Sequence, residues 1–169
     1  MKIIEGLKKL KYLEKKLDDL KEKIRRFCCD MDYETPAYPD QKEQIESWIQ
    51  SYKDVLKEIS NISYRLHKTN IETKVKIELD GKIVEKSIAE WILRRRKLIT
   101  METNLYTLLT DRGLKEGPVQ FPSGNILNAK IRRYYDIKEK DRKLTSLSNE
   151  PFEIDSKLEI VNAITDLIE

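Results

Sequence analysis

The fold is decided by residues 40–69, which read DQKEQIESWIQSYKDVLKEISNISYRLHKT. Apolar side chains recur in this stretch at alternating intervals of three and four residues: Ile45, Trp48, Tyr52, Val55, Ile59, Ile62 and Leu66. This spacing places them on one side of an α-helix, as in the seam of a coiled coil. Asp40, followed three residues later by Glu43, is typical of a helix N-terminus. The stretch therefore predicts a long helix over about 40–69 that packs against other helices.

Three further segments predict helices over about 3–27, 88–112 and 137–168. The first repeats apolar residues from Ile3 to Phe27, mainly at intervals of three and four. The second follows the capping-box pattern Ser87-Ile88-Ala89-Glu90. It is expected to place five apolar residues on one face and to end near Gly113: Trp91, Leu98, Met101, Leu105 and Leu108.

The last predicted helix begins after Asp136, with Glu139 three residues later. Pro151 lies inside it, and proline fits the first turn of a helix but not its interior. We therefore expect the helix to kink or to restart at Pro151.

Between residues 74 and 86 the apolar residues no longer follow a helical spacing and instead recur at every second position. Val75, Ile77 and Leu79 alternate with charged residues and are followed by Asp80-Gly81. An Asp-Gly pair between alternating segments predicts a β-hairpin with a two-residue turn. Because an isolated hairpin is marginally stable in water, it is expected to lie on the helices or on a neighbouring subunit.

The segment over about 114–135 is rich in glycine and proline. It predicts a long loop or a second hairpin, with 119–121 paired to 130–132. The predicted fold class is mainly α, an antiparallel bundle of four long helices with these insertions, in a single domain over residues 1–169. The composition agrees, since 37% of the 169 residues are charged and only five are glycine, which excludes collagen-like and linker-like chains.

Charge and cysteine content limit the classes of partner. Lys and Arg total 33 against 30 Asp and Glu, so the net charge of +3 is too mild to mark the whole domain as a nucleic-acid binder. Cys28 and Cys29 are neighbours, and a disulfide between them would be strained, so free thiols in a reducing compartment are expected. No 18-residue apolar run and no signal peptide is found, which favours the cytoplasm and no membrane partner.

Two clusters of arginine are candidate ligand-binding sites. Arg94 and Arg95 open the run Arg94-Arg95-Arg96-Lys97 and are expected at the edge of the apolar face of their helix. A buried arginine there needs a carboxylate or an anionic ligand. The run is therefore either a clamp for phosphate or nucleotide, or a solvated face with one internal salt bridge.

The second cluster contains Arg132, Arg133, Tyr134 and Tyr135. Guanidinium groups beside aromatic rings can stack a base and hold a phosphate. Alternation along a strand would place Arg132 and Tyr134 on one face and the other two on the opposite face. An ordinary loop anchored by buried tyrosines is the equally plausible alternative.

Signals for catalysis are weak. His67 is the single histidine, and no His, Cys or carboxylate set with metal-ligand spacing accompanies it, so no metal and no cofactor are expected. Cys28 and Cys29 follow the C-terminus of a predicted helix, which does not lower the pKa of a thiol. The sequence contains neither a P-loop nor a dinucleotide-binding glycine pattern. We therefore expect a protein that is not an enzyme.

From Arg65 onward, over about half its length, the chain resembles the septicolysin-like family of small helical bacterial proteins. Three groups of residues carry the resemblance: Arg65 with Lys68-Thr69-Asn70; Ser87-Ile88-Ala89-Glu90 with Arg94-Arg95; and Ile154-Asp155, Glu159, Asn162 and Thr165-Asp166-Leu167. The spacing of Asp136, Asp155 and Asn162 is also similar, whereas Ala163 stands where the family pattern has tryptophan. The resemblance implies an α-helical, oligomeric bundle of unestablished role. The pore formation implied by the family label is not carried over, since no segment resembles a membrane-inserting one.

Two hypotheses of different classes follow. The first is a non-enzymatic assembly protein whose helical seams extend across a homo-oligomer interface, because narrow-faced long helices bury their seams more completely in pairs. The alternative is a sponge-type protein, possible in a phage-encoded setting, that sequesters a nucleotide-like or nucleic-acid anion through the arginine clusters.

Overall fold

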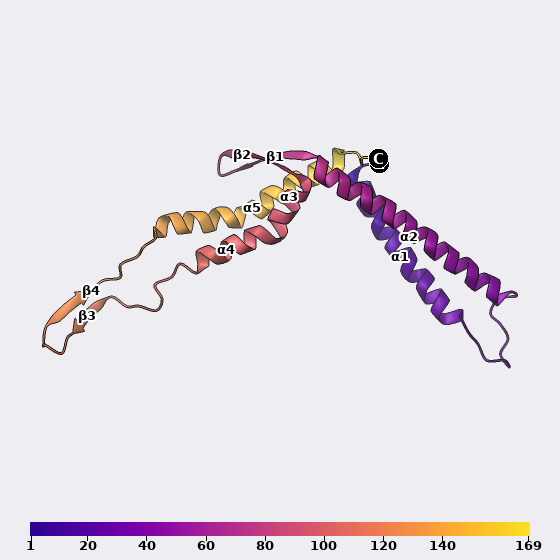
Figure 1. Cartoon of the computed structure of the whole chain (residues 1–169), viewed down its shortest axis with the longest axis horizontal. Coiled ribbons are helices and arrows are strands. Elements are labelled where there is room, and N and C mark those ends of the chain that lie inside the picture. Colours follow the sequence, from indigo (N-terminus) through magenta and orange to yellow (C-terminus); the bar gives the residue numbers. More distant parts are fainter. The chain divides into compact units, whose positions relative to one another are not determined.

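The strict three–four pattern forms helix α2 (Gln41–Glu72) in the computed structural model, which describes residues 1–169 (Figure 1). The carboxylate of Asp40 accepts a hydrogen bond from the backbone N–H of Glu43 (3.0 Å), so the predicted N-cap is confirmed. All seven apolar positions of the seam are buried or half-buried. The amphipathic helix predicted for this stretch is therefore confirmed.

The chain divides into two compact units, which are described in turn. Unit 1 consists of Met1–Val75, Ser87–Ala89 and Leu158–Glu169. Unit 2 consists of Lys76–Lys86 and Glu90–Lys157.

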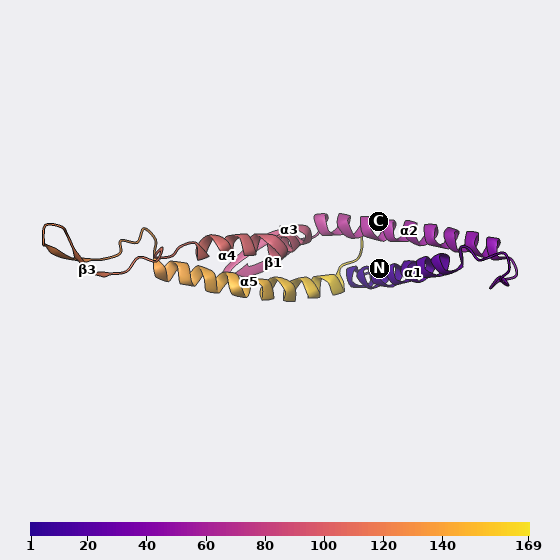
Figure 2. The same cartoon turned by 90° about the horizontal axis from the view of Figure 1, so that it is seen from below.

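Unit 1 is built on a pair of helices, α1 (Ile3–Phe27) and α2, which run side by side (Figures 1 and 2). The bounds of α1 are those predicted from the sequence. Leu13 and Leu20 of α1 and Val55, Ile62 and Leu66 of α2 are buried. Beside the connecting loop, the rings of Phe27, Tyr38 and Trp48 meet with centroids 5.4–5.8 Å apart.

The C-terminal segment closes unit 1 at the N-terminus of α1. The backbone N–H of Ile3 donates to the carbonyl of Thr165 (3.0 Å), and that of Leu167 donates to the carbonyl of Met1 (2.8 Å). The Nζ of Lys2 lies 2.6 Å from the carboxylate of Asp166, which lowers the pKa of that carboxyl group. Residues more than 160 positions apart are thus joined by a short β-bridge and an ion pair.

The first hairpin forms as predicted, from β1 (Lys74–Leu79) and β2 (Lys82–Ser87). Asp80 and Gly81 form the turn with φ angles of 51° and 72°, as a type I′ turn requires. Within unit 2 the hydroxyl of Ser146 donates to the Asp80 carboxylate (2.8 Å), so the turn is tied to a helix, as expected for a hairpin this short.

Unit 2 contains most of two helical segments. One is continuous through α3 (Ile88–Leu93), the π-helix η1 (Arg94–Leu98) and α4 (Ile99–Thr107), and the other is α5 (Ile137–Ile164). The carboxylate of Asp136 accepts from the backbone N–H of Glu139 (3.1 Å), which confirms the predicted start of α5. The expected restart at Pro151 does not occur, since α5 continues through it.

The apolar face predicted for the third helix is confirmed at Trp91 and wrong at its other four positions. Trp91 is fully buried, whereas the remaining four residues form an exposed stripe: Leu98 (37% exposed), Met101 (56%), Leu105 (59%) and Leu108 (76%). A π-helical turn closes i→i+5 hydrogen bonds and so holds about one residue more than an α-helical turn, which rotates the following residues by about 100°. Ile99 instead takes the buried position.

A second hairpin also forms, from β3 (Gly117–Gln120) and β4 (Ile126–Ala129), but its second strand starts four residues earlier than predicted. It lies beyond the ends of α4 and α5 in both views (Figures 1 and 2), and we call residues 117–129 the arm. The third helix ends at Thr107 and not at 112; Gly113 still takes the positive φ (75°) expected of a chain reversal.

The predicted fold class, mainly α with a β-hairpin, is confirmed by these elements. Whether the chain is a single domain stays a prediction. None of the helices combines the length and apolar character needed to cross a bilayer.

Gly6 of α1 lies close to Leu167 of the C-terminal segment, and this contact allows a test of how that segment closes unit 1. A Cβ atom at this position would lie 3.0 Å from Cδ1 of Leu167, and Leu66 and Ile62 are also within 4 Å. We expect Gly6→Leu to displace the C-terminal segment and to lower the free energy of unfolding by about 1–3 kcal/mol, the usual cost of overpacking. Urea unfolding followed by circular dichroism measures it.

Lys11→Leu, at an exposed position of the same helix, is the control for introducing a leucine side chain, because lysine and leucine have similar helix propensities. Equal stability of the two variants would contradict the role of Gly6.

Candidate functional site

The π-helix η1 places two consecutive arginines toward α5. Arg94 pairs with Glu150, and Arg95 pairs with Asp155, five residues further along α5. Adjacent residues of a regular α-helix diverge by about 100°, which makes two such pairs with one neighbouring helix difficult to form. π-helical turns are frequent at functional sites, so we treat this region as the candidate site.

Arg94 is held by two carboxylates. Its Nε and Nη2 donate to the two oxygens of Glu150 (2.6 and 2.7 Å), and its Nη1 donates to Glu102 (2.6 Å). The side chains of Arg94 and Glu150 are 19% and 5% exposed. The hydrogen bond to Glu150 raises the pKa of Arg94, outweighing the opposite effect of burial. A buried arginine here was expected to need a carboxylate or an anionic ligand, and carboxylates take this role.

Arg95 has a weaker arrangement. Its guanidinium lies 2.8 Å from the carboxylate of Asp155, and both side chains are more exposed than those of the Arg94 pair. Exposed ion pairs of this kind contribute at most about 1 kcal/mol.

A cavity of about 210 Å³ lies beside Arg94 in unit 2. Charges of both signs line it, including Lys86, Glu102 and Lys143. The Nζ of Lys86 also lies 5.4 Å from the centre of the Trp91 ring. Its volume is below the roughly 300–1,000 Å³ of typical ligand pockets, so it has room only for a small group.

The second arginine cluster lies near the base of the arm. Arg133 donates two hydrogen bonds to the carboxylate of Asp111 (2.6 and 2.7 Å), and these bonds lower the pKa of Asp111 and raise that of Arg133. Arg132 and Tyr134 are exposed, whereas Arg133 and Tyr135 are half-buried, so the predicted alternation holds although no strand forms there.

No hydrogen bond or ion pair joins the two clusters. Arg94, Arg95 and Arg133 already have carboxylate partners within unit 2, whereas Arg132 has none. Binding of an anion by these arginines stays a prediction, and it would have to compete with the existing ion pairs.

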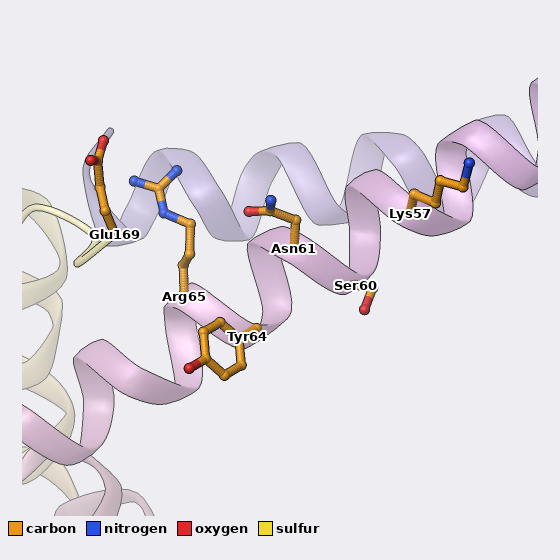
Figure 3. Close-up of a pocket in the computed structure, with 6 residues that line it drawn as sticks. All are labelled: Lys57, Ser60, Asn61, Tyr64, Arg65 and Glu169. Carbon is orange, nitrogen blue, oxygen red and sulfur yellow. The ribbon is translucent and has the colours of Figure 1, made fainter.

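Sequence reasoning missed a surface cavity of unit 1 with a volume of about 700 Å³. Five of the six residues that line it come from α2 and one from the C-terminal segment (Figure 3): Lys57, Ser60, Asn61, Tyr64, Arg65 and Glu169. The Nε of Arg65 donates to the carbonyl of Ile168 (3.2 Å), and the hydroxyl of Thr69 accepts from the N–H of the same residue (2.9 Å). Arg65 and Thr69 therefore fasten the C-terminal segment to α2.

The residues considered for catalysis are separate and exposed. His67 lies on the surface of α2. Cys28 and Cys29 are free thiols, and a hydrogen bond with Cys28 raises the pKa of Cys29, which is opposite to the activation of a nucleophile. No group of three or more His, Cys, Asp or Glu side chains is arranged to hold a metal ion.

Comparison with known proteins places the chain in a family. A family model described as "Family of unknown function (DUF6847)" matches residues 10–167. The chain belongs to this family. No match is found among curated proteins.

A solved structure is similar over almost the full chain of this DUF6847 member. It is the crystal structure of a functionally unknown conserved protein from Corynebacterium diphtheriae, with 16% sequence identity, a TM-score of 0.59 and coverage of 99% of both chains. At this identity the likeness concerns the fold alone. Neither comparison carries the septicolysin-like label, so that resemblance stays a prediction.

The burial of Glu150 predicts unequal roles for the two arginines of the π-helix. Arg94→Ala leaves Glu150 buried without its main partner and is expected to lower the free energy of unfolding by about 3–5 kcal/mol. Arg95→Ala, the matched control, is expected to cost at most about 1 kcal/mol. Urea unfolding of both variants measures the difference.

A double variant separates the effect of leaving the Glu150 carboxylate unpaired from the effect of losing side-chain packing. Arg94→Leu combined with Glu150→Leu is expected to recover most of the stability, because no uncompensated buried carboxylate remains. Equal losses for Arg94→Ala and Arg95→Ala would contradict this assignment.

The Asp111–Arg133 pair predicts a pH dependence. Because the pKa of Asp111 is lowered, the pair stabilises the folded protein above the ordinary aspartate pKa of about 3.9, and this stabilisation is lost as the pH falls through the lowered pKa. In an NMR titration of side-chain carboxyl groups, Arg133→Gln should raise the midpoint of Asp111 toward its ordinary value. The midpoint of Asp166, which is lowered by Lys2, should stay unchanged.

Proposed function

We propose that this DUF6847 protein is a non-enzymatic assembly protein that forms a homo-oligomer in the cytoplasm. The observation that carries the proposal is the exposed stripe Leu98, Met101, Leu105 and Leu108, which we call the α4 stripe. Its spacing of three, four and three residues is that of a helix seam, so it suits packing against another chain. Exposed contiguous apolar surface of this kind is typical of interaction sites.

The opposite side of α4 already has its contacts within unit 2. Ile99 is buried, and Glu102 is paired with Arg94. These contacts fix the rotation of the helix about its axis, so that the α4 stripe cannot turn inward without breaking the Arg94–Glu102 ion pair. A partner chain is therefore the available means of covering the stripe.

Native mass spectrometry and light scattering test the proposal on freshly purified, unheated protein. The expected mass is a multiple of 20.1 kDa at micromolar concentration. Leu105→Glu should shift this mass to that of the monomer, because it places a charge within the apolar stripe. Ile83→Glu, at an exposed apolar position of β2, is the matched control and should leave the oligomer intact.

A wild-type protein that is monomeric under these conditions would overturn the proposal.

The sequestering hypothesis is the second proposal, and one observation supports it. Arg132 and Tyr134 are exposed near the base of the arm, and Arg132 has no carboxylate partner, so both groups are available to an anion with an aromatic base. Extra mass of nucleotide size in the same native spectra would favour this function. The loss of that mass in Arg132→Ala, with the helical content unchanged, would locate the site.

A further inference from the structure

The arm has an apolar face that nothing in its own chain covers. In the pairing of β3 with β4, Val119 lies opposite Leu127, so the two side chains project from the same face of the hairpin. Phe121 is two residues beyond Val119 and so belongs to that face as well. The three side chains are 44%, 58% and 45% exposed for Val119, Leu127 and Phe121.

The arm is also without charge. Residues 117–129, GPVQFPSGNILNA, contain no charged residue, although 37% of the chain is charged. Residues 98–110, LITMETNLYTLLT, which carry the α4 stripe, contain only Glu102, and its charge is paired with Arg94. Depletion of charged residues is the compositional mark of the core of a protein–protein interface. The two segments are thus matched in polarity, because contact between them would bury no unpaired charge.

The two surfaces also match in length. The α4 stripe extends over eleven residues of helix, Leu98 to Leu108, or about 16 Å. A strand of four residues extends over about 13 Å. One face of the arm can therefore cover most of the α4 stripe.

The base of the arm is fastened so that it points away from its own α4. Arg133 is paired with Asp111 across the two segments that lead into and out of the arm, and the N–H of Ile131 donates to the carboxylate of Glu116 (3.0 Å). The Nζ of Lys140 donates to the carbonyl of Leu109 (2.6 Å), which joins the first of these segments to α5. Figures 1 and 2 show the arm beyond the ends of both helices, so a second copy is the nearest source of a matching surface.

We propose that the arm of one copy packs its Val119–Phe121–Leu127 face on the α4 stripe of a second copy, and that the exchange is reciprocal. Each copy supplies one arm and one stripe, so two equal contacts close a dimer with two-fold symmetry. The inference rests on the proposed function, and it assigns the surfaces that the assembly uses.

Two lysine variants test which face of the arm is used. Leu127→Lys places a charge on the apolar face and should raise the dissociation constant of the dimer at least about tenfold. Ile126→Lys is the matched control, because Ile126 is an exposed neighbour on the opposite face of the same hairpin and should leave the constant unchanged. Light scattering over a dilution series measures both, and circular dichroism confirms that the helical content is kept.

Disulfide trapping tests the contact itself. In a Cys28→Ser, Cys29→Ser background, Leu105→Cys and Leu127→Cys are placed in separate chains of different mass, which are co-expressed and then oxidised. A disulfide between the two kinds of chain is expected, and it can form only between copies. Disulfides that join two Leu105→Cys chains alone would show α4 against α4 and would overturn the inference.

The outcomes separate this inference from the proposed function. A wild-type oligomer that survives Leu127→Lys, or that is disrupted equally by Ile126→Lys, overturns the assignment of the arm and leaves the assembly function standing. A wild-type monomer overturns both.

Discussion

The structure of unit 2 depends on the ion pair between Arg94 and Glu150. A carboxylate that is 95% buried is costly unless its charge is compensated, and the bidentate guanidinium compensates it with two short hydrogen bonds. Holding Arg94 in this position, with Arg95 also directed at α5, is compatible with the wide turn of the π-helix. The π-helical turn sets the rotation of α4 about its axis and so determines which residues of α4 face inward. The π-helix that holds this buried pair is followed by Ile99 in the core, and four apolar residues from Leu98 to Leu108 lie at the surface.

Much of the fold could be predicted because local patterns specify it. The seam of α2, the N-caps at Asp40 and Asp136 and the Asp80-Gly81 turn each depend on residues within one turn or one hairpin. The π-helix could not be found in this way. It is accompanied by two ion pairs with residues 56 and 60 positions away, and these have no local signature. A regular α-helical period predicts a buried face that is right at Trp91 but wrong for the four apolar residues from Leu98 to Leu108.

The sequence predicts the arginines of the candidate site but not the carboxylates with which they pair. Arg94, Arg95 and Arg133 stand out in the sequence as clustered charges, and the structure shows a carboxylate beside each of them. The chain contains 30 acidic residues distributed along its length. No local sequence pattern therefore identifies Glu150, Asp155 or Asp111 as the partners of these arginines. The register of β4 was missed for a similar reason, since Ile126 and Leu127 carry no alternation with charged residues. The similar fold at 16% identity in the Corynebacterium diphtheriae protein shows that this architecture tolerates extensive change of sequence.

The closure of unit 1 has a consequence for the order of events during synthesis. Ile3 and Met1 form their backbone hydrogen bonds with Thr165 and Leu167, and the core around Gly6 includes Leu167. Domains usually fold as they emerge from the ribosome, the N-terminal one first. Here the start of the first helix bonds to residues 165–167, so the helical pair α1–α2 is synthesised before the segment that closes its end. Unit 1 is therefore completed only after unit 2 has been synthesised, and any chain truncated before residue 165 lacks the segment that closes unit 1.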